Sequence, residues 1–397
     1  MNKEKKINYL VGNSKIKRIS SVPYSKKVLS FLTDLSSELN NSKYSKEYPD
    51  IKTLSFFLRK ASLLNLQKKY LNSNNETRLG LGLVFHITPS NMPTNFFYSL
   101  IFGLLTGNSN IVKVPSKNFV QVDIICNLIK KLISKKHNGI NNLIKIVKYT
   151  DHEKYTKEFS SNCDARIIWG GDKTIKEVRK FEINPRSSEL TFSDRYSICI
   201  VESGKFLKLN QTKKKLLALK FYNDTFVADQ NACSSPHLIL WLGKNIKKAK
   251  LIFWNLVNDL VKIKYDLTEV ASIEKYTELC KKLAIDSNIK NFKTFSSNVY
   301  TVNLKSFQND MSTYRGRWGF FYEQEIKNIN SLKKIISKKF QTLTYFGIEK
   351  KTLKKFIIDN KINGIDRIVP IGQGLDINFF WDGYDINKVL TRVIDIK

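Results

Sequence analysis

The sequence predicts an α/β protein with two units of sheet and helix, on the strength of three observations. The chain has 397 residues, of which 42% are hydrophobic, and this is enough for two or three domains with separate cores. Short apolar segments alternate with longer segments of helical spacing, which is typical of parallel sheets covered by helices. A second series of such segments begins shortly before residue 229, so we expect a second α/β unit there.

The first quarter of the chain lacks this alternation. Residues 1–25 are polar and basic, and we expect them to be partly loose. Residues 28–39 and 51–70 have helical apolar spacing, and the polar residues 73–76 break the pattern. We therefore expect residues 1–78 to form a mainly helical segment that packs on the domain after it.

Alternating strands and helices begin near residue 81 and predict a parallel sheet with helices on both faces. We assign residues 79–205 to a dinucleotide-binding domain, although the usual GxGxxG fingerprint is missing. In a parallel sheet of this kind, ligands bind at the carboxyl ends of the strands. The expected strands are 81–87, 111–114, 144–149, 165–169 and 198–201, and the expected helices are 94–105, 119–133, 153–159 and 172–180.

The second α/β unit is predicted over residues 206–375, and residues 376–397 form a C-terminal segment. It begins with a basic helix at 213–226, which precedes a polar loop. Further helices are expected at 246–263 and 267–283, and further strands at 238–242, 299–302, 318–322, 343–346 and 367–371.

The charge balance is strongly basic, with 67 Lys and Arg against 35 Asp and Glu and a net charge of +32. Such a charge suggests nucleic-acid binding, but the lysines are scattered and accompany no RNA- or DNA-binding pattern. Lysine, asparagine and isoleucine are abundant together, as an AT-rich genome would produce. The alternative is a preference for anions such as a nucleotide phosphate, a coenzyme A phosphate or an acidic carrier protein. We expect no specific nucleic acid as a partner.

Targeting and redox signals point to the cytoplasm. The basic N-terminus is followed by no apolar region, and no apolar run of about 18 residues exists, so neither a secretory signal nor a membrane span is expected. The five cysteines are widely spaced and include no CxxC pair, which argues against a disulfide framework and a zinc site. We expect no metal.

Cys233 is the candidate nucleophile. It lies in the polar segment DQNACSSPH, residues 229–237, between a predicted helix and a predicted strand, where a ligand can reach it. A thiolate exchanges thioesters and attacks carbonyl carbons. The alternative is a small loop residue without a function.

A second polar loop, ITPSNMP at residues 87–93, follows the first strand of the predicted sheet. Pro89 and Pro93 stiffen this loop, so the amide of Asn91 could be held to donate a hydrogen bond to an oxyanion. The alternative is that Asn91 caps the helix that starts near residue 94.

Candidate cofactor contacts follow the next strands. Lys113, Ser116 and Lys117 place two cations and a hydroxyl at a strand end, which suits an adenosine ribose or its phosphate. No acid stands there to pair with ribose hydroxyls, and this favours NADPH without excluding NADH. Gly170 and Gly171 open a helix and can approach a phosphate closely. The alternatives are surface lysines and an ordinary turn.

Five motifs in order resemble the acyl-CoA reductase family typified by the long-chain fatty-acid reductase of bacterial luciferase systems, within the aldehyde dehydrogenase superfamily. They are HITPSNMP at 86–93, WGGD at 169–172, DQNACSSP at 229–236, DRIVPIGQ at 366–373 and WDGY at 381–384. The resemblance extends from about residue 80 to 393. It implies an aldehyde-dehydrogenase-like fold, with a Rossmann-type cofactor domain and a second α/β catalytic domain.

The same resemblance assigns roles. It makes Cys233 the acyl-accepting nucleophile, Asn91 an oxyanion donor, and Lys113 with Ser116 a cofactor contact. Aldehyde dehydrogenases carry a water-activating glutamate in a segment whose counterpart here, TFSDR at 191–195, has none, and Glu189 is out of register. The resemblance also implies a homo-oligomer, with residues 376–397 as a possible oligomerisation arm, and a possible acyl-protein synthetase partner.

His237 is four residues beyond the candidate nucleophile and could tune the thiol or donate a proton to a forming aldehyde. The alternative is that it simply begins a strand. His86 is open to the same two interpretations. Cys126, Cys199 and Cys280 are expected to be inert core thiols, and Cys163 has no visible partner in the sequence.

The function hypothesis is the NADPH-dependent reduction of an acyl thioester to an aldehyde through an acyl-cysteine. The acyl donor is acyl-CoA or an acyl group delivered by a partner synthetase. The first alternative is a cysteine-dependent acyltransferase without redox chemistry. A second alternative is a nucleic-acid binder driven by the net charge of +32, which would show steep salt dependence.

Overall fold

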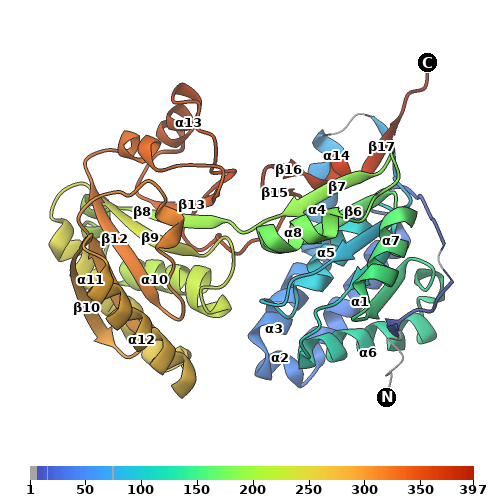
Figure 1. Ribbon diagram of the computed structural model, residues 1–397, viewed down its shortest axis with the longest axis horizontal. Coiled ribbons are helices and arrows are strands. Elements are labelled where there is room, and N and C mark those ends of the chain that lie inside the picture. Colours follow the sequence, from blue (N-terminus) through green and yellow to red (C-terminus); the bar gives the residue numbers. More distant parts are fainter. Residues whose placement is uncertain (1–6, 16, 74–75) are drawn as a thin grey trace. The chain divides into compact units, whose positions relative to one another are not determined.

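The computed structural model describes residues 7–15, 17–73 and 76–397 and contains two compact units. The first unit comprises Met1–Asp194 and Asn378–Lys397, and the second comprises Arg195–Ile377 (Figure 1). Both are α/β units, as predicted. The chain therefore leaves the first unit once and returns to it at the C-terminus.

The first unit is built on a six-stranded sheet in the order β1-β5-β4-β3-β6-β7. All neighbouring strands in it are parallel except β1, which runs antiparallel to β5. The two short antiparallel pairs β15-β16 and β17-β2 complete its strands. Strand bounds are β1 Asn8–Val11, β2 Thr77–Gly80, β3 Leu83–Ile87, β4 Ser109–Lys113, β5 Ile144–Lys148, β6 Ala165–Trp169, β7 Ser188–Phe192, β15 Phe380–Trp381, β16 Tyr384–Asp385 and β17 Thr391–Ile394.

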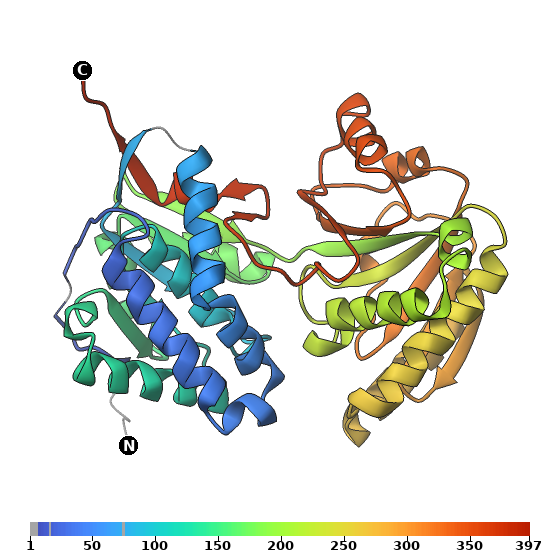
Figure 2. The same cartoon turned by 180° about the vertical axis from the view of Figure 1, so that it is seen from behind.

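Helices cover both faces of this sheet. Phe85 on β3 packs in one core cluster with residues of α7 and α8, whereas the neighbouring His86 contacts α5 on the other side. Figures 1 and 2 show α1 on the face opposite α8. Helix bounds are α1 Lys26–Asn41, α2 Tyr44–Glu47, α3 Pro49–Phe57, α4 Lys60–Ser73, α5 Asn95–Leu105, α6 Val120–Lys135, α7 Lys157–Asn162, α8 Asp172–Arg179 and α14 Ile386–Val389, with the single turns η1 Asn138–Ile140 and η2 His152–Thr156.

The second unit has a seven-stranded sheet in the order β10-β11-β12-β9-β8-β13-β14. Its strands are parallel apart from the edge strand β10, which pairs antiparallel with β11. The central strands are apolar and buried, as a sheet covered on both faces requires. Strand bounds are β8 Tyr196–Glu202, β9 Pro236–Leu242, β10 Ile289–Ser296, β11 Val299–Leu304, β12 Phe320–Ile326, β13 Phe340–Phe346 and β14 Arg367–Pro370.

Alternate residues of β8 and β9 enter separate cores on the two faces of this sheet. Cys199 and Trp241 pack with α10 and α11, whereas Ile198 and Leu240 pack with α12 and α13. Helix bounds are α9 Ser203–Leu207, α10 Gln211–Thr225, α11 Ile246–Lys264, α12 Glu269–Ile285 and α13 Lys350–Asp359, with the 3₁₀ turns η3 Phe226–Ala228, η4 Met311–Thr313 and η5 Ile329–Lys334.

The unit boundaries differ from those predicted. The first falls after Asp194 instead of residue 205, because β8 pairs with β9 and β13 of the second unit. The second falls after Ile377, close to the predicted residue 375. Residues 376–397 do not stand apart as an arm within the chain, because β17 pairs with β2. Whether they also contact another copy stays a prediction.

Two N-terminal predictions also need correction. Residues 8–11, expected to be loose, form β1 and extend the first sheet, because Tyr9 pairs with Val147. The apolar pattern over residues 51–70 covers two helices instead of one, since α3 ends at Phe57 and α4 begins at Lys60. The part of this prediction that concerns residues 1–6 lies outside the described residues.

Within the described part of the chain, no helix has the length and apolar character needed to cross a membrane.

Candidate active site

Cys233 lies in a loop at the amino end of β9. After α10 and η3, Asp229 and Gln230 adopt left-handed backbone conformations with φ of 51° and 60°, which turn the chain sharply. Cys233 is half-buried, whereas Cys126, Cys163 and Cys199 are buried and Cys280 is exposed.

The accessibility of the cysteines matches prediction only in part. Burial raises the pKa of each thiol of Cys126, Cys163 and Cys199 to about 12, so these three are inert, as expected for Cys126 and Cys199. The prediction was wrong for Cys280, because its side chain lies on the outer side of α12. Cys233 is thus partly accessible on a loop, and Cys280 is accessible on a helix.

The loop that carries Cys233, residues 229–235, is called the thiol loop below, and side-chain hydrogen bonds fasten it to its surroundings. The Ser197 hydroxyl on β8 donates to the Cys233 carbonyl oxygen at 2.6 Å. The buried Gln230 amide donates to the carbonyls of Pro236 and Phe320, both at 3.1 Å, and accepts from the Gly319 N–H at 3.2 Å. These contacts tie the loop to the amino ends of β8, β9 and β12.

A second loop, residues 370–376, is fastened to α10, the helix that precedes the thiol loop. The buried Asp224 carboxylate on α10 accepts hydrogen bonds from the N–H groups of Gly372 and Gly374, at 2.6 and 2.8 Å. Burial raises the pKa of Asp224 to about 7, and the two amide donors oppose that rise. The Ser235 hydroxyl donates to the Asp224 carbonyl oxygen at 2.7 Å. Asp224 therefore holds both the thiol loop and the loop at residues 370–376.

His237 does not have the surroundings of a proton donor. It is 4% exposed in β9, stacks on Tyr196, and its Nδ1 lies 3.1 Å from the Gly316 carbonyl oxygen. Burial, reinforced by the positive charge of Arg315, lowers the pKa of His237 to about 3. A neutral, fully packed imidazole favours the alternative that His237 is a strand residue.

Asn91 lies on the exposed loop between β3 and α5. The position that caps α5 is Thr94, three residues later, so Asn91 does not occupy the cap that the structural alternative assigned to it. Its amide therefore lies at the carboxyl edge of the first sheet, on a polar loop.

Lys113 is the last residue of β4 and is 6% exposed. Its amine lies 5.5 Å from the centre of the Tyr149 ring, and no carboxylate pairs with it in the described part of the chain. Burial and the nearby Lys148 lower the pKa of Lys113. Ser116 and Lys117 follow on the exposed loop after β4. Hydroxyl and ammonium groups thus gather at one strand end.

Gly170 and Gly171 connect β6 to α8. The Gly170 N–H donates to the Phe192 carbonyl at 3.1 Å, and a side-chain carbon on Gly170 would approach Thr174 to 3.0 Å. A side-chain carbon on Gly171 would meet nothing within 4 Å. Gly171 is exposed directly before the first turn of α8, where backbone N–H groups can meet a phosphate.

A buried chain of hydrogen bonds begins at Trp169, the residue before this glycine turn. The Trp169 indole donates to the Ser99 hydroxyl at 2.9 Å, and that hydroxyl lies 2.8 Å from Nδ1 of His86. Nε2 of His86 lies 3.0 Å from Oδ1 of Asn110. The Asn110 amide nitrogen donates to backbone carbonyls, so Oδ1 must accept and Nε2 must carry the proton.

His86 is therefore a structural residue. It is fully buried, and burial lowers its pKa to about 4, so the ring is neutral at physiological pH. Its hydrogen bonds to Ser99 and Asn110 use both ring nitrogens. Of its two interpretations from the sequence, the structural one fits.

Glu189 is engaged as a counter-ion. It accepts from Nε of the buried Arg166 at 2.9 Å and pairs with Nε of Arg179 at 2.7 Å. A carboxylate that balances two guanidinium groups is poorly placed to deprotonate water. The nearby segment at residues 191–195, TFSDR, contains no glutamate.

The structure groups the predicted residues within each unit. Asn91, Lys113, Ser116, Lys117, Gly170 and Gly171 follow the adjacent parallel strands β3, β4 and β6, at the carboxyl edge of the first sheet. Cys233 lies at the amino edge of the second sheet. The supporting residues Ser197, Gln230 and Asp224 were not predicted, since their partners lie far away along the sequence.

Solved structures share this architecture and define the class of fold. Lactaldehyde dehydrogenase from Escherichia coli aligns over 93% of this chain and 86% of its own, with a TM-score of 0.61 and 11% identity. Glyceraldehyde-3-phosphate dehydrogenase from Methanocaldococcus jannaschii, solved with NADP, aligns over 93% and 88%, with a TM-score of 0.62 and 13% identity. The protein thus has the aldehyde dehydrogenase fold, as predicted.

The family is narrower than the fold. Residues 56–393 match the acyl-CoA reductase (LuxC) family, and the chain belongs to it. The resemblance seen in the sequence is therefore confirmed.

Curated relatives with detectable similarity are long-chain acyl-protein thioester reductases. The one from Aliivibrio fischeri is 25% identical over 169 residues, which cover 42% of this chain and 33% of the relative. The one from Photorhabdus luminescens is 22% identical over 327 residues, covering 79% and 62%. The chain therefore spans less than two thirds of the length of either relative.

Proposed function

We propose that this protein reduces an acyl thioester to an aldehyde, with a nicotinamide cofactor and an acyl-Cys233 intermediate. The observation that carries the proposal is the position of Cys233. It is half-buried on a loop that side-chain hydrogen bonds fasten at three strand ends. The aldehyde dehydrogenase fold and the acyl-CoA reductase family support the same chemistry.

The first step transfers the acyl group to the protein. The Cys233 sulfur attacks the carbonyl carbon of the thioester, a new carbon–sulfur bond forms, and the donor thiol leaves with a proton. Charge develops on the carbonyl oxygen during this attack. Asn91, exposed on its loop, is proposed to donate a hydrogen bond to that oxygen, and one such donor is worth about 100- to 1,000-fold in rate.

The second step releases the aldehyde. When bound, NADPH supplies the hydride that reduces the acyl carbon, and the carbon–sulfur bond to Cys233 then breaks. The overall change consumes one thioester, one NADPH and one proton, and yields aldehyde, thiol and NADP⁺. The ion pairs of Glu189 with Arg166 and Arg179 leave no glutamate near residues 191–195 to activate water, which protects the acyl-enzyme from hydrolysis.

The cofactor residues fit a phosphorylated ribose. Lys113, Ser116 and Lys117 follow β4, and no carboxylate pairs with the Lys113 amine among the described residues. An acid at this place would pair with ribose hydroxyls, and a cation pairs with a ribose phosphate instead. Gly170 and Gly171 offer the backbone approach that a pyrophosphate needs. We therefore propose NADPH over NADH.

The acyl donor is proposed to be acyl-CoA or an acyl group passed on by an acyl-protein synthetase. The relatives from Aliivibrio fischeri and Photorhabdus luminescens are named for acyl-protein thioesters, which supports the second source. We also propose that the protein acts as a homo-oligomer.

The deciding experiment measures intact mass after mixing the protein with acyl-CoAs of different chain length. We expect one acyl adduct per chain, which disappears when NADPH is added as aldehyde forms in equal amount. The Cys233→Ser variant should lose both the adduct and the aldehyde. Cys280→Ser, which changes the exposed thiol on α12, is the matched control and should keep both.

The alternative, a cysteine acyltransferase, gives a different result in this experiment. The adduct would form but NADPH would be neither consumed nor needed for its loss. NADPH oxidation equal to the aldehyde formed would eliminate that alternative, and its absence would overturn the reductase proposal.

Cofactor choice is tested separately. Lys113→Ala should raise the KM for NADPH at least about tenfold, since a lost charge-assisted contact costs about 1.5–3 kcal/mol. The KM for NADH should change much less. Equal effects on both cofactors would contradict a ribose-phosphate contact. Lys148→Ala, which changes a partly exposed lysine at the end of the neighbouring strand β5, measures the general effect of lost positive charge.

A further inference from the structure

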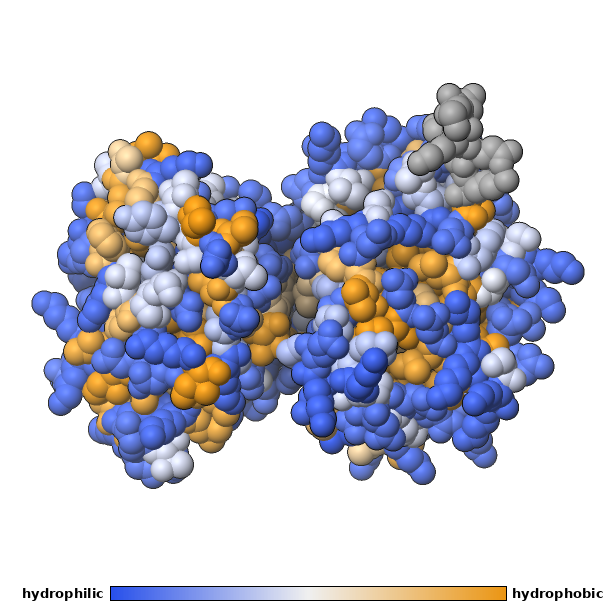
Figure 3. All heavy atoms as spheres, turned by 90° about the horizontal axis from the view of Figure 1, so that it is seen from below, coloured by the Kyte–Doolittle hydropathy of each residue, from blue (hydrophilic) through white to orange (hydrophobic). Residues whose placement is uncertain are grey.

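Helix α12 (Glu269–Ile285) has apolar residues on two sides. Ala271, Lys275 and Leu279 face the core at four-residue spacing. A second stripe is exposed to solvent: Val270 is 67% exposed, Ile273 66%, Tyr276 59% and Leu283 37%. A surface helix normally carries one apolar stripe, and a second one indicates a missing contact. Figure 3 shows apolar side chains among the polar ones on the surface of this unit, at the left.

We propose that α12 packs antiparallel against α12 of a second copy of this chain, about a two-fold axis between Tyr276 and Thr277. This inference rests on the proposed homo-oligomer but not on the proposed chemistry. A two-fold interface must be complementary to itself, because the same patch supplies both sides. The exposed stripe has this property.

The stripe is symmetric about its centre. In an antiparallel pair centred between residues 276 and 277, Val270 faces Leu283 of the other copy. Ile273 likewise faces Cys280 of the other copy, and all four of these side chains are exposed on α12. Every apolar side chain thus meets an apolar or small partner. A parallel arrangement would have no two-fold axis perpendicular to the helices and would leave these pairs unmatched.

The charges on α12 favour the same orientation. Apart from the buried Lys275, the first half of the helix carries Glu269 and Glu274, and the second half carries Glu278, Lys281 and Lys282, with Lys282 4.0 Å from Glu278. An antiparallel copy brings the acidic half of each helix to the other copy's second half, where the lysines outnumber the glutamate. Charge arranged in this way selects orientation and partner more than it adds affinity.

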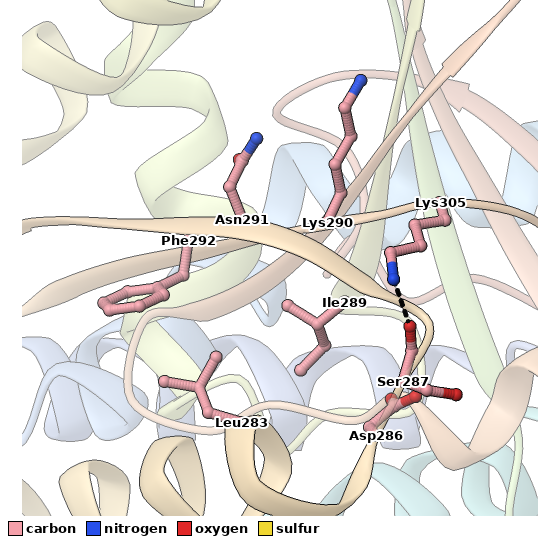
Figure 4. Close-up of a pocket in the computed structure, with 8 residues that line it drawn as sticks. All are labelled: Leu283, Asp286, Ser287, Ile289, Lys290, Asn291, Phe292 and Lys305. Atoms are coloured by element: carbon pink, nitrogen blue, oxygen red, sulfur yellow. Dashed lines mark hydrogen bonds between the residues drawn. The ribbon is translucent and has the colours of Figure 1, made fainter.

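A hollow at the C-terminal end of α12 lies where the other copy would place its Val270. Its volume is about 460 Å³, and its lining includes Leu283 and, on β10, Phe292. Figure 4 shows Leu283, Ile289 and Phe292 gathered at its apolar side, with the chains of Lys290 and Lys305 nearby. An apolar side chain from the other copy can enter between Leu283, Ile289 and Phe292.

The first test measures molar mass by light scattering after size-exclusion chromatography. Ile273→Glu should halve the mass of the assembly, because two buried glutamates would face the apolar stripe. Ile358→Glu, at an equally apolar position that is 59% exposed on α13, should leave the mass unchanged. A wild-type protein of monomer mass, or an Ile273→Glu assembly of wild-type mass, would overturn the proposal.

The second test uses a residue that the chain already has. Ile273→Cys should form a disulfide with Cys280 of the other copy under mild oxidation, giving a dimer on a non-reducing gel. The same variant with Cys280→Ser should not, and Ile358→Cys should not. Absence of the disulfide-linked dimer in the Ile273→Cys variant would contradict the antiparallel register.

The charge pattern on α12 allows a third test, in which a second charge reversal restores a dimer that the first one weakens. Glu274→Lys should weaken the dimer, and Glu274→Lys with Lys281→Glu should restore it, because the two positions lie near each other across the axis. NADPH oxidation by each variant is recorded separately. If an α12 variant loses the dimer but still oxidises NADPH, the interface is supported independently of the proposed reaction. If the variant is active and its molar mass equals that of wild type, the interface is refuted and the proposed reaction is not.

Discussion

Replacing Gln230 by alanine should loosen the thiol loop while leaving the thiol unchanged. The Gln230 side chain is 1% exposed and makes hydrogen bonds to Pro236, Phe320 and Gly319. The substitution leaves three buried backbone groups without this partner. An unpaired buried group costs about 1–3 kcal/mol, so we expect a loss of about 3 kcal/mol in the free energy of unfolding of the second unit.

The assay is urea unfolding of the purified variant beside wild type. With a slope on the order of 2 kcal/mol per molar, the midpoint should fall by about 1–2 M. The rate of Cys233 acylation should fall by about tenfold to a hundredfold, because the loop no longer holds the sulfur in one place. Gln308→Ala, which changes an exposed glutamine in the same unit, is the control. Equal midpoints for the two variants would refute the role assigned to Gln230.

The isosteric change Gln230→Glu separates hydrogen bonding from volume. An ionised carboxylate would face the carbonyls of Pro236 and Phe320, so the buried group should take up a proton and its pKa should rise. The folded variant then binds more protons than its unfolded state, and its stability should fall as pH rises through the raised pKa. A variant that is as stable at pH 8 as at pH 5, relative to wild type, would contradict this account.

Two further predictions concern titration and thiol access. Burial lowers the pKa of His86 to about 4 and that of His237 to about 3, so the unfolded chain alone takes up these protons below about pH 6.5. The free energy of unfolding should therefore be highest above that pH and fall by about 1.4 kcal/mol per pH unit for each histidine between about pH 6 and 4. Denaturant midpoints measured across this range test this expectation, and midpoints that do not change with pH would contradict the burial of the two histidines. In the folded Ile273→Glu protein, whose α12 is not covered by a second copy, maleimide should label Cys280 quickly and Cys233 more slowly, with three thiols reacting only in denaturant. Mass spectrometry that finds a third adduct on the folded protein would contradict the assigned burial.

Local patterns in the sequence were sufficient to predict most of the architecture. The strands β3, β4, β5 and β6 are short apolar runs between polar turns, and each prediction agrees with the structure to within a few residues. A residue pattern of this kind depends only on near neighbours. It also placed the candidate thiol correctly in a loop before a strand, β9.

Features that depend on long-range pairing were missed. The four-residue segment Asn8–Val11 becomes β1 because it pairs with the edge of β5. Likewise, Thr77–Gly80 and Thr391–Ile394 pair although they are more than 300 residues apart along the chain. No local pattern marks such segments as strands.

The supporting part of the site was hidden for the same reason. Asp224 holds amides of residues 372 and 374, and Arg367 donates to carbonyls of the same loop. Each is an ordinary polar residue until the fold brings it to its partner. His237 shows the converse, because closeness to Cys233 in sequence suggested catalysis, whereas its strand position buries it.

The central claim is that Cys233 carries the acyl group during reduction. The most direct measurement is peptide mass spectrometry of the Cys280→Ser protein, quenched in acid seconds after mixing with acyl-CoA and without NADPH. We expect the acyl group on the peptide that contains Cys233, and we expect its loss to match aldehyde formation after NADPH is added. An acyl group found elsewhere, or aldehyde produced by Cys233→Ser, would contradict the account.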